Sequence, residues 1–275
     1  MALEAPSKDE NKKRRRLKEN SVYGNYKSYY GYRVDHSLSE EPRMKVMKKE
    51  WFEDKDCLDI GCNQGFMTIS IAMKFFCRSM VGIDIDQNLV ERAKRNLQRI
   101  AATKSAITSL EPCEAESSKG TESLELSKDQ PTLKGTDLIE SVKFRKENVL
   151  EKLQPCSPEY DTILCLSVTK WIHLNWGDSG LIALFAKMWH LLRPYVVFDW
   201  QGGILVLEPQ PWVSYQRKRR VSERAAANFK DILMKPCYFP EILLDKIGFR
   251  HMENATNNLQ GSVVGFNRPI FVFRK

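Results

Sequence analysis

The first residues that could take part in chemistry form a glycine turn, C-L-D-I-G-C-N-Q-G-F, at Cys57–Phe66. An apolar run precedes Gly61 and a helix-like apolar run follows Gly65, which is the strand–turn–helix order of nucleotide-binding folds. A dinucleotide site needs glycine where this chain has Asn63, so that the backbone can approach a pyrophosphate, and a further glycine where it has Thr68. The turn therefore favours a cofactor without phosphates.

S-adenosylmethionine is a cofactor of this kind, and Gly61 and Gly65 would let the backbone pass close to its methionine end. Asn63 offers hydrogen bonds, and Asp59 with the backbone of the turn would hold the amino-acid part. Asp84 stands 23 residues after Gly61, at the end of the next strand-like run, where a carboxylate accepts hydrogen bonds from both ribose hydroxyls. Dehydrogenases also place an acid on ribose, so a dinucleotide cofactor stays open, as does a plain glycine turn with a surface aspartate.

A second chemically capable stretch, S-V-T-K-W-I-H-L-N-W-G-D (Ser167–Asp178), follows a buried strand-like run. We predict a loop here, at the catalytic edge of the sheet, without the N-P-P-Y-like residues of enzymes that methylate base nitrogens. A phosphate oxygen is already an anion, so as a methyl acceptor it needs positioning and nearby cations more than a base. Lys170 suits charge-holding and His173 suits hydrogen bonding. A solvated lysine and tryptophans that only pack in the core are the alternatives.

Two stretches combine aromatic or polar residues with basic ones. Y-G-N-Y-K-S-Y-Y-G-Y-R (Tyr23–Arg33) holds five tyrosines, which would either clamp a nucleotide together with the cations or fasten the arm to the core. R-K-R-R (Arg217–Arg220) follows E-P-Q-P-W, where a substrate would approach. The candidate substrate contacts are Arg33, Trp171, Arg217 and Lys218.

The apolar pattern supplies the elements that position these residues. Strands are predicted over Asp56–Ile60, Met80–Ile85, a stretch within 141–150, Tyr160–Val168, Gly202–Pro209, Phe249–Asn254 and Pro269–Phe273. Helices are predicted over Gly65–Phe76, from Asp86 through Ile100, over Asp178–Leu192, near Ser222–Leu233 and near Glu241–Lys246. This alternation predicts a parallel sheet with helices on both faces, whose ligands bind at the carboxyl ends of the strands.

Composition indicates one domain over residues 21–275, preceded by a disordered basic arm at 1–20. The arm carries K-K-R-R-R-L-K at Lys12–Lys18, which would serve as a nuclear import signal or phosphate-binding tail, or would be solvated charge alone. Residues 102–140 are rich in Ser, Glu, Lys and Thr and lack periodicity, which predicts a flexible insertion.

Charge and cysteine content narrow the class of protein further. The formal net charge is +8, which favours a polyanionic partner, although a basic enzyme without one is equally consistent. Neither a membrane-length apolar run nor a secretory h-region is present, so we expect a soluble intracellular protein. Seven scattered cysteines without C-x-x-C predict reduced thiols, with neither a metal site nor disulfides.

With these residues described, the chain resembles the bicoid-interacting-protein-3 family of RNA methyltransferases. The resemblance runs from Tyr23 to Phe273, through Y-G-N-Y-K-S-Y-Y-G-Y-R, L-D-I-G-C-N-Q-G-F-M-T-I-S-I-A, V-G-I-D-I-D, E-Y-D-T-I-L-C-L-S-V-T-K-W-I-H-L-N-W-G-D, G-G-I-L-V-L-E-P-Q-P-W and F-N-R-P-I-F-V-F. It implies a Rossmann-like class I S-adenosylmethionine-dependent methyltransferase with a mostly parallel seven-stranded sheet. The implied reaction methylates the γ-phosphate of an RNA 5′ triphosphate, as in the capping of small nuclear RNA.

The resemblance also implies roles for particular residues. The implied cofactor contacts are Tyr30, Arg43, Gly61, Cys62, Asn63, Asp84, Ile85, Asn148 and Leu166, beside Asp59 and Gly65 from the turn itself. Tyr29, Arg33, Lys170 and His173 would face the RNA end, with Lys170, His173 and Tyr29 as the catalytic candidates. Val149 replaces an aromatic residue of the family, which implies a different packing against adenine.

The chain departs from the family between L-L-R-P and G-G-I-L-V-L-E-P. The family joins these segments directly, whereas Y-V-V-F-D-W-Q (Tyr195–Gln201) intervenes here. We expect either an extra loop at the end of the sheet away from the cofactor or a disturbance of the strand that follows.

Three functions remain open from the sequence: methylation of an RNA 5′ γ-phosphate, methylation of a 5′ monophosphate, or a non-catalytic RNA-binding platform within a ribonucleoprotein. RNA with a 5′ phosphate is the expected partner in the first two. We expect a monomer, in the nucleus because of the basic arm, with the cytoplasm as the alternative.

Overall fold

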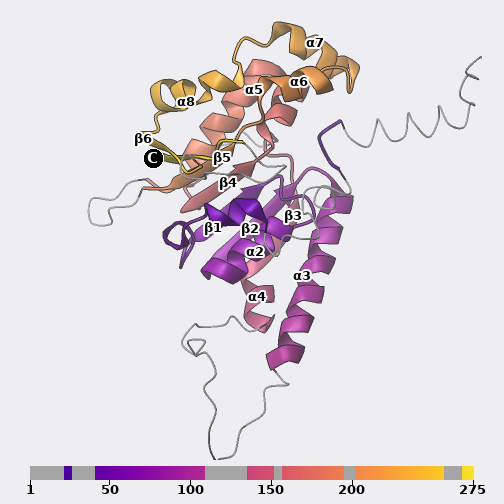
Figure 1. Cartoon of the computed structure of the whole chain (residues 1–275), viewed down its shortest axis with the longest axis vertical. Helices are drawn as coiled ribbons and strands as arrows, with labels where there is room; N and C mark the ends of the chain where they lie inside the picture. The colour runs from indigo at the N-terminus through magenta and orange to yellow at the C-terminus, as the bar shows by residue number, and fades with distance from the viewer. Residues whose placement is uncertain (1–21, 27–40, 109–134, 152–156, 195–201, 257–267) are drawn as a thin grey trace, which may run out of the picture.

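The computed structural model describes residues 22–26, 41–108, 135–151, 157–194, 202–256 and 268–275. In these ranges a seven-stranded sheet runs through the middle of the molecule in the order β3-β2-β1-β4-β5-β7-β6 (Figure 1). Its strands are β1 (Asp56–Ile60), β2 (Ser79–Asp84), β3 (Val142–Lys146), β4 (Thr162–Leu166), β5 (Ile204–Glu208), β6 (His251–Asn254) and β7 (Phe271–Arg274). The strands pair in parallel except where β7 meets β5 and β6. The predicted Rossmann-like, mostly parallel sheet is confirmed.

Alternating side chains divide the core into two layers, one on each face of the sheet. In β4 the side chains of Leu164 and Leu166 belong to one apolar cluster, and those of Ile163 and Cys165 belong to the other. All five residues of β4 are buried, as expected for a central parallel strand with both faces covered. The two clusters hold the sheet rigidly beneath whatever binds at its edge.

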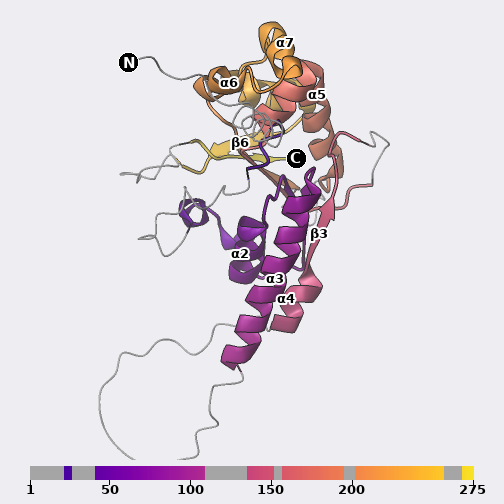
Figure 2. The same ribbon diagram turned by 90° about the vertical axis from the view of Figure 1, so that its right-hand side faces the viewer.

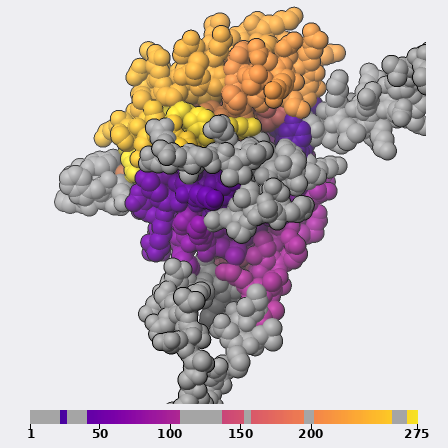
Figure 3. Space-filling model, in the orientation of Figure 1, coloured from indigo at the N-terminus to yellow at the C-terminus, as the bar shows by residue number. Residues whose placement is uncertain are grey.

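Helices cover both faces, and a third layer lies on top of one of them (Figures 1 and 2). The first face carries η1 (Pro42–Lys45), η2 (Lys49–Trp51), α2 (Phe66–Phe75), α3 (Gln87–Thr108) and α4 (Gly135–Ser141). The second face carries α5 (Thr169–Leu191), α8 (Phe239–Glu241), which follows η3 (Pro236–Tyr238), and the π-helix η4 (Ile242–Ile247). Against the first half of α5 pack α6 (Trp212–Lys218) and α7 (Glu223–Asp231), which form the orange surface of Figure 3.

The stretch predicted as a loop after β4 is instead helical. Helix α5 begins at Thr169, directly after the strand, and is interrupted at Gly177, where φ is 66° and ψ is −167°. The predicted helix from Asp178 corresponds to its second half. The prediction of a loop over 167–178 was wrong for Thr169–Trp176, because the contacts that start this helix come from residues distant in the sequence.

The predicted insertion at 102–140 was drawn too wide. Helix α3 continues to Thr108, with Ala101 buried in the core, and α4 places Leu138 in the same cluster. Both ends of the segment are therefore helical, and its middle, 109–134, lies outside the described residues, as does the arm at 1–20.

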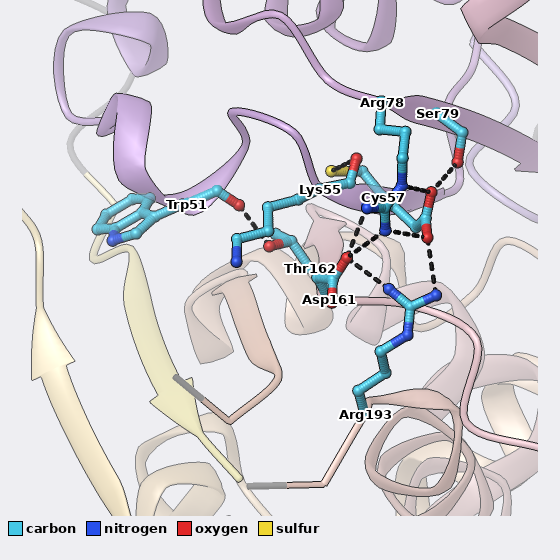
Figure 4. Close-up of polar contacts among 9 residues, drawn as sticks. Trp51, Lys55, Cys57, Arg78, Ser79, Asp161, Thr162 and Arg193 are labelled. Carbon is cyan, nitrogen blue, oxygen red and sulfur yellow. Dashed lines mark hydrogen bonds and ion pairs between the residues drawn. The ribbon is translucent and has the colours of Figure 1, made fainter. Parts of the chain in front are cut away.

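The amino ends of β1 and β4 are tied together by charged side chains (Figure 4). Arg193 donates to Asp56 Oδ2 at 2.7 Å and to Asp161 Oδ2 at 2.6 Å. Arg78 reaches the same two carboxylates, and Ser79 donates to Asp56 at 2.7 Å. The Arg78 guanidinium, followed by those of Arg193 and the Ser79 hydroxyl, holds the pKa of Asp56 well below its usual range.

The extra segment Tyr195–Gln201 lies outside the described residues, but both of its flanks are described. Gly203 N donates to Arg193 O at 3.0 Å, and Arg193 N donates to Tyr160 O at 2.9 Å. Because Ile204 begins β5 in register with Thr162 of β4, the segment enters and leaves at the amino edge of an intact strand. The fifth strand is thus intact, and the two flanks of the segment lie at the amino edge of the sheet, away from the pocket.

Across the described ranges no helix is long and apolar enough to cross a membrane. The same residues contain no group of three or more His, Cys, Asp or Glu side chains placed to hold a metal ion. The free thiols are those of Cys57, Cys62, Cys77, Cys165 and Cys237.

Candidate functional site

A pocket opens at the carboxyl ends of β1 to β4, the edge where ligands bind in parallel sheets. It holds about 900 Å³ of space, counted out to open solvent, which is enough for a nucleoside-sized ligand. It is lined by Tyr23, Gly24, Asn25, Arg43, Asp59, Ile60, Gly61, Cys62, Asn63, Met67, Ile83, Asp84, Ile85, Glu147, Asn148, Val149, Leu166, Ser167, Val168, Trp171, Ile172 and Trp176.

The glycine turn after β1 forms the floor of this pocket. Gly61 has φ 75°, and a Cβ there would lie 2.4 Å from Val168 Cγ2, so no larger residue fits. Asn63 also takes a left-handed conformation, at φ 52°, and its backbone N–H donates to Asp84 Oδ2 at 3.0 Å. Gly65 (φ 76°) packs against Phe144 and is not among the residues that line the pocket, so its cofactor contact stays a prediction. Its role is to close the turn.

Two buried carboxyl groups face the pocket from neighbouring strands. Asp84, at the end of β2, accepts hydrogen bonds from the backbone N–H groups of Asn63 and Asp86. Asp59 of β1 accepts one from Thr68 Oγ1 at 2.6 Å. Burial raises the pKa of both Asp59 and Asp84 to about 6, because the charged forms have lost most of their hydration. Each carboxyl group therefore has lone pairs that can accept further hydrogen bonds, and its charged form is poorly solvated. A hydrogen-bond donor or a cation from a ligand would stabilise that charged form.

Arg43 brings a positive charge to the same wall. Its side chain is 4% exposed; Nε donates to both oxygens of Glu41 at 2.8 and 2.9 Å, and Nη1 donates to Glu208 at 3.1 Å. Arg268 holds the second oxygen of Glu208 at 3.3 Å and the Ser167 hydroxyl at 2.8 Å. A buried guanidinium fixed in this way is positioned to bind a carboxylate.

Gln210 organises the turn that follows β4. Its Oε1 accepts from Lys170 N at 3.1 Å and from Thr169 Oγ1 at 3.3 Å, and its Nε2 donates to Ser167 O. Ser167 has φ 63°, a conformation that residues other than glycine seldom adopt. The side chain of Gln210, 1% exposed, thus caps α5 from 40 residues away and holds the pocket wall at Ser167.

The segment Val22–Tyr26, which we call the strap, closes one side of the pocket. Tyr23 stacks on Trp176 with ring centroids 5.7 Å apart, and Tyr26 meets the Trp171 ring edge-on at 5.8 Å. Asn175 donates to Val22 O at 2.9 Å. Of the two roles open for the tyrosine-rich stretch, these contacts show fastening to the core for Tyr23 and Tyr26.

Two of the predicted catalytic residues do not reach the pocket. Successive residues of α5 turn by 100°, so Val168, Trp171 and Ile172 face the pocket while Lys170 and His173 point the other way. Lys170 Nζ donates to Ser214 Oγ at 2.8 Å and lies 4.4 Å from the centre of the Trp171 ring. Neither side chain lines the pocket; both lie on the side of α5 that faces α6, and their predicted contact with the RNA end stays a prediction.

His173 is fully buried among aromatic rings. Its Nε2 lies 2.5 Å from Asp178 Oδ1, and its Nδ1 lies 3.4 Å from the Tyr215 hydroxyl. Burial lowers the pKa of His173, against the opposing effect of Asp178. These contacts tie the two halves of α5 to α6 across the break at Gly177, which is a structural role.

The remaining predicted residues fall into two groups. Trp171 lines the pocket, and Arg217 and Lys218 lie at the end of α6, with Lys218 Nζ 5.3 Å from the centre of the Tyr26 ring. Tyr29, Tyr30 and Arg33 lie outside the described residues.

The pocket fits S-adenosylmethionine, by the chemistry of its lining. Asp84 offers acceptors for the ribose hydroxyls, Asp59 a counter-charge for the ammonium group, and Arg43 one for the carboxylate. The apolar side chains of Ile85 and Val149 would flank adenine. The cofactor contacts implied for Arg43, Asp59, Gly61, Cys62, Asn63, Asp84, Ile85, Asn148 and Leu166 all line this pocket.

Sequence reasoning missed several lining residues that belong to the strap and to the turn after β4. Gly24 and Asn25 sit within a stretch that was noted only for its tyrosines. Ser167 and Val168 had a usable signal, because residues directly after a buried parallel strand lie at the ligand edge. Trp176 lies one helical turn after Ile172, on the same face of α5.

Comparison with known proteins follows this geometry. Residues 58–197 match the family model described as methyltransferase domain, and residues 160–275 match the one described as bicoid-interacting protein 3. The first match covers the part of the cofactor pocket built by β1 to β4, and the cofactor of the fold is S-adenosylmethionine. The second covers the acceptor side and everything after β4 begins.

Three curated relatives span nearly all of this chain. A probable RNA methyltransferase of Arabidopsis thaliana is 49% identical, over 92% of this chain and 80% of its own length. The U6 snRNA methylphosphate capping enzyme Amus of Drosophila melanogaster is 36% identical, over 93% and 75%. The human 7SK snRNA methylphosphate capping enzyme is 37% identical over 92% of this chain, which spans 39% of that longer protein.

Proposed function

Since this chain belongs to the bicoid-interacting protein 3 family of RNA methyltransferases, we propose that it methylates the 5′ γ-phosphate of a small non-coding RNA. The relatives named as methylphosphate capping enzymes act on 7SK and U6 snRNA, and their similarity supports a phosphate acceptor here. A 5′ monophosphate and a purely RNA-binding role are the alternatives that the experiment must separate.

The acceptor wall of the pocket carries the proposal. In the described part of the chain it consists of Ser167, Val168, Trp171, Ile172 and Trp176, with Tyr23 stacked on Trp176. None of these side chains is a general base at neutral pH, and His173 is turned away. A hydroxyl or amine acceptor would have to lose a proton there, whereas a phosphate oxygen would not. The wall thus suits an acceptor that arrives as an anion.

When bound, S-adenosylmethionine supplies a methyl group on a positively charged sulfur. Asp59, Asp84 and Arg43 would fix its ends, and the tryptophans would exclude water from the acceptor. Lys170 contributes charge from behind the Trp171 ring instead of by direct contact. A γ-phosphate oxygen that accepted this methyl group would already carry a negative charge, and the sulfur would retain the electron pair of the broken bond, so no lining residue would need to remove a proton.

The remainder of the RNA would lie on the basic surface beside the pocket. Residues 211–238 hold seven arginines and lysines but two aspartates and glutamates. Arg217 is exposed there, and Lys218 borders the strap through Tyr26. Phosphate contacts of this kind position an RNA without reading its sequence.

The test incubates the full chain and labelled S-adenosylmethionine with one RNA bearing a 5′ triphosphate, a 5′ monophosphate or a 5′ hydroxyl. We expect label on the triphosphate RNA, resistant to a phosphomonoesterase because the methylated γ-phosphate is a diester, and released by a pyrophosphatase that cleaves within the triphosphate. Preferred labelling of the monophosphate RNA would select that alternative, and equal labelling of the hydroxyl RNA would exclude a phosphate acceptor. RNA binding without any labelling would select the platform role.

The cellular setting is a further part of the proposal. The basic run Lys12–Lys18 supports import into the nucleus, where small nuclear RNAs are capped. Fusion to a fluorescent protein, with and without residues 1–20, would show whether this segment directs import. We also propose that the protein is a monomer, which light scattering after gel filtration would test.

A further inference from the structure

Asn25 lines the pocket, and its side-chain amide also contacts the residues that follow β2. Its Nδ2 donates to Asp86 Oδ2 at 2.6 Å, across 61 residues of sequence. The same side chain lines the pocket beside Asp84, whose Oδ1 accepts from the backbone N–H of Asp86. Asn25 is therefore held at the end of β2, next to the carboxylate expected to bind ribose.

The carbonyl oxygen of Asn25 is a buried acceptor for which the described residues provide no partner. The orientation of the amide is fixed by chemistry: the Asp86 carboxylate only accepts, so the NH₂ group must face it and Oδ1 must face away from it. Buried acceptors are rarely left without a hydrogen bond in folded proteins. Within a ligand pocket, the missing donor belongs to the ligand.

The residues around Asn25 indicate which hydrogen-bond donor of the ligand would meet its carbonyl oxygen. Among the hydrogen-bond donors of S-adenosylmethionine, the ammonium group belongs at Asp59, and the ribose hydroxyls belong at Asp84. Asn25 is joined to Asp84 through Asp86, while Tyr23 and Tyr26 on either side of it contact Trp176 and Trp171. We propose that Asn25 Oδ1 accepts a hydrogen bond from one ribose hydroxyl of the cofactor, so that Asp84 and Asn25 hold the diol together.

This contact makes the strap part of the cofactor site. Tyr23 and Tyr26 attach the strap to α5, and Asn63 Nδ2 donates to Tyr26 O at 3.3 Å from the glycine turn. The cofactor would then bind the strap directly through Asn25. The strap in turn presents Tyr23 and Trp176 to the acceptor, so cofactor binding and the shape of the acceptor wall are linked.

The test measures binding of S-adenosylhomocysteine and of its 2′-deoxy and 3′-deoxy analogues by calorimetry, without RNA. We expect wild type to bind each deoxy analogue at least about 10-fold more weakly than the parent compound, since each lost hydroxyl leaves an acceptor unpaired. In Asn25→Leu the parent compound binds more weakly, and the loss for one deoxy analogue shrinks to within about 3-fold, because its acceptor is gone.

A second variant distinguishes loss of the hydrogen bond to the cofactor from a change in the shape of the strap. Asn25→Asp keeps an acceptor but loses the donor to Asp86, so overall affinity falls while discrimination against both deoxy analogues remains. Asn254→Leu is the matched control, because Asn254 closes a turn at the β6 edge of the sheet, and it should bind all three ligands as wild type does.

Equal weakening of all three ligands in Asn25→Leu would overturn the inference and leave Asn25 with a role in strap shape alone. Unchanged affinity would overturn it as well. The inference rests on the cofactor and on no particular acceptor. Because RNA is absent from these measurements, a failure of the inference about Asn25 can be distinguished from a failure of the γ-phosphate proposal.

Discussion

Strand β1 carries Asp56 at its amino end and Asp59 near its carboxyl end, and the two carboxyl groups are treated in opposite ways. Hydrogen bonds from Arg78 and Arg193 hold the pKa of Asp56 well below its usual range, whereas burial raises that of Asp59 to about 6. At the amino edge each charge is neutralised by another side chain. At the carboxyl edge the charges of Asp59 and Asp84 are left for a ligand to neutralise.

The two edges therefore make opposite contributions to stability as the pH changes. The lowered pKa of Asp56 stabilises the fold above its unfolded value of 3.8, and this stability is lost only as the pH falls through the folded value. The raised pKa values of Asp59 and Asp84 stabilise the ligand-free fold most below 3.8, and this stability is lost as the pH rises through about 6. At neutral pH the carboxyl group of Asp56 stabilises the fold. Those of Asp59 and Asp84 destabilise the ligand-free fold and are available to bind a ligand.

The largest effect on cofactor binding is expected from Asp84→Ala, at the carboxyl edge of the sheet. Removing an acceptor that serves two ribose hydroxyls should weaken S-adenosylhomocysteine binding by about 100-fold or more, since hydrogen bonds to charged groups contribute about 1.5–3 kcal/mol each. Calorimetry measures the effect, with Asp56→Ala as the control at the other edge. A comparable loss of affinity in Asp56→Ala would contradict the division of roles.

Asp59→Asn tests the pH dependence directly. Asparagine does not titrate, so its free energy of unfolding relative to wild type should rise between pH 4.5 and 7.5, by on the order of 2–3 kcal/mol for the shift from 3.8 to about 6. Urea denaturation of the ligand-free proteins measures this difference. In the same pH range, wild-type cofactor affinity should fall as the pH drops below about 6. A flat stability difference would show that Asp59 does not titrate as described.

Gln210→Leu should damage the pocket edge more than the fold. The variant leaves the start of α5 uncapped and Ser167 O without its donor, which costs about 1–3 kcal/mol of stability and should lower kcat at least about 10-fold. Thr162→Val removes one buried hydrogen bond, to Trp51 O, at the amino edge (Figure 4). It serves as the control: stability should fall while kcat stays within about 2-fold of wild type.

Arg193→Ala is expected to have the smallest effect. Its guanidinium joins Asp56 and Asp161 but is 38% exposed, so solvent screening limits the loss to about 1 kcal/mol of unfolding free energy. The difference from wild type should shrink in high salt, and cofactor affinity should not change. A loss of affinity would mean that the two edges are coupled.

Much of the sheet and of the cofactor floor could be predicted, because both depend on local pattern. Buried strands such as β4 read as apolar runs, and Gly61 and Asp84 stand at fixed distances from them. Such features need no knowledge of distant residues. For the extra segment Tyr195–Gln201 the sequence left two outcomes open, and the intact β5 rules out a disturbed strand.

The errors share a different physical cause, namely contacts between residues far apart in the chain. The start of α5 is capped by Gln210, 40 residues later, so Ser167–Asp178 looked like a loop. Asn25 depends on Asp86, 61 residues away, and no local motif marks that pairing. The predicted boundary at residue 102 failed because α3 lacks a stop signal there.

The hydrogen bond from Gly203 N to Arg193 O has a practical consequence. It pins the two ends of the segment between them, so the entropy of closing that loop changes only slowly with its length. The position lies at the amino edge of β5, opposite the pocket. An epitope or a fluorescent reporter inserted between Pro194 and Gly202 would therefore label the protein internally, where a terminal tag would sit beside the basic arm or the last strand.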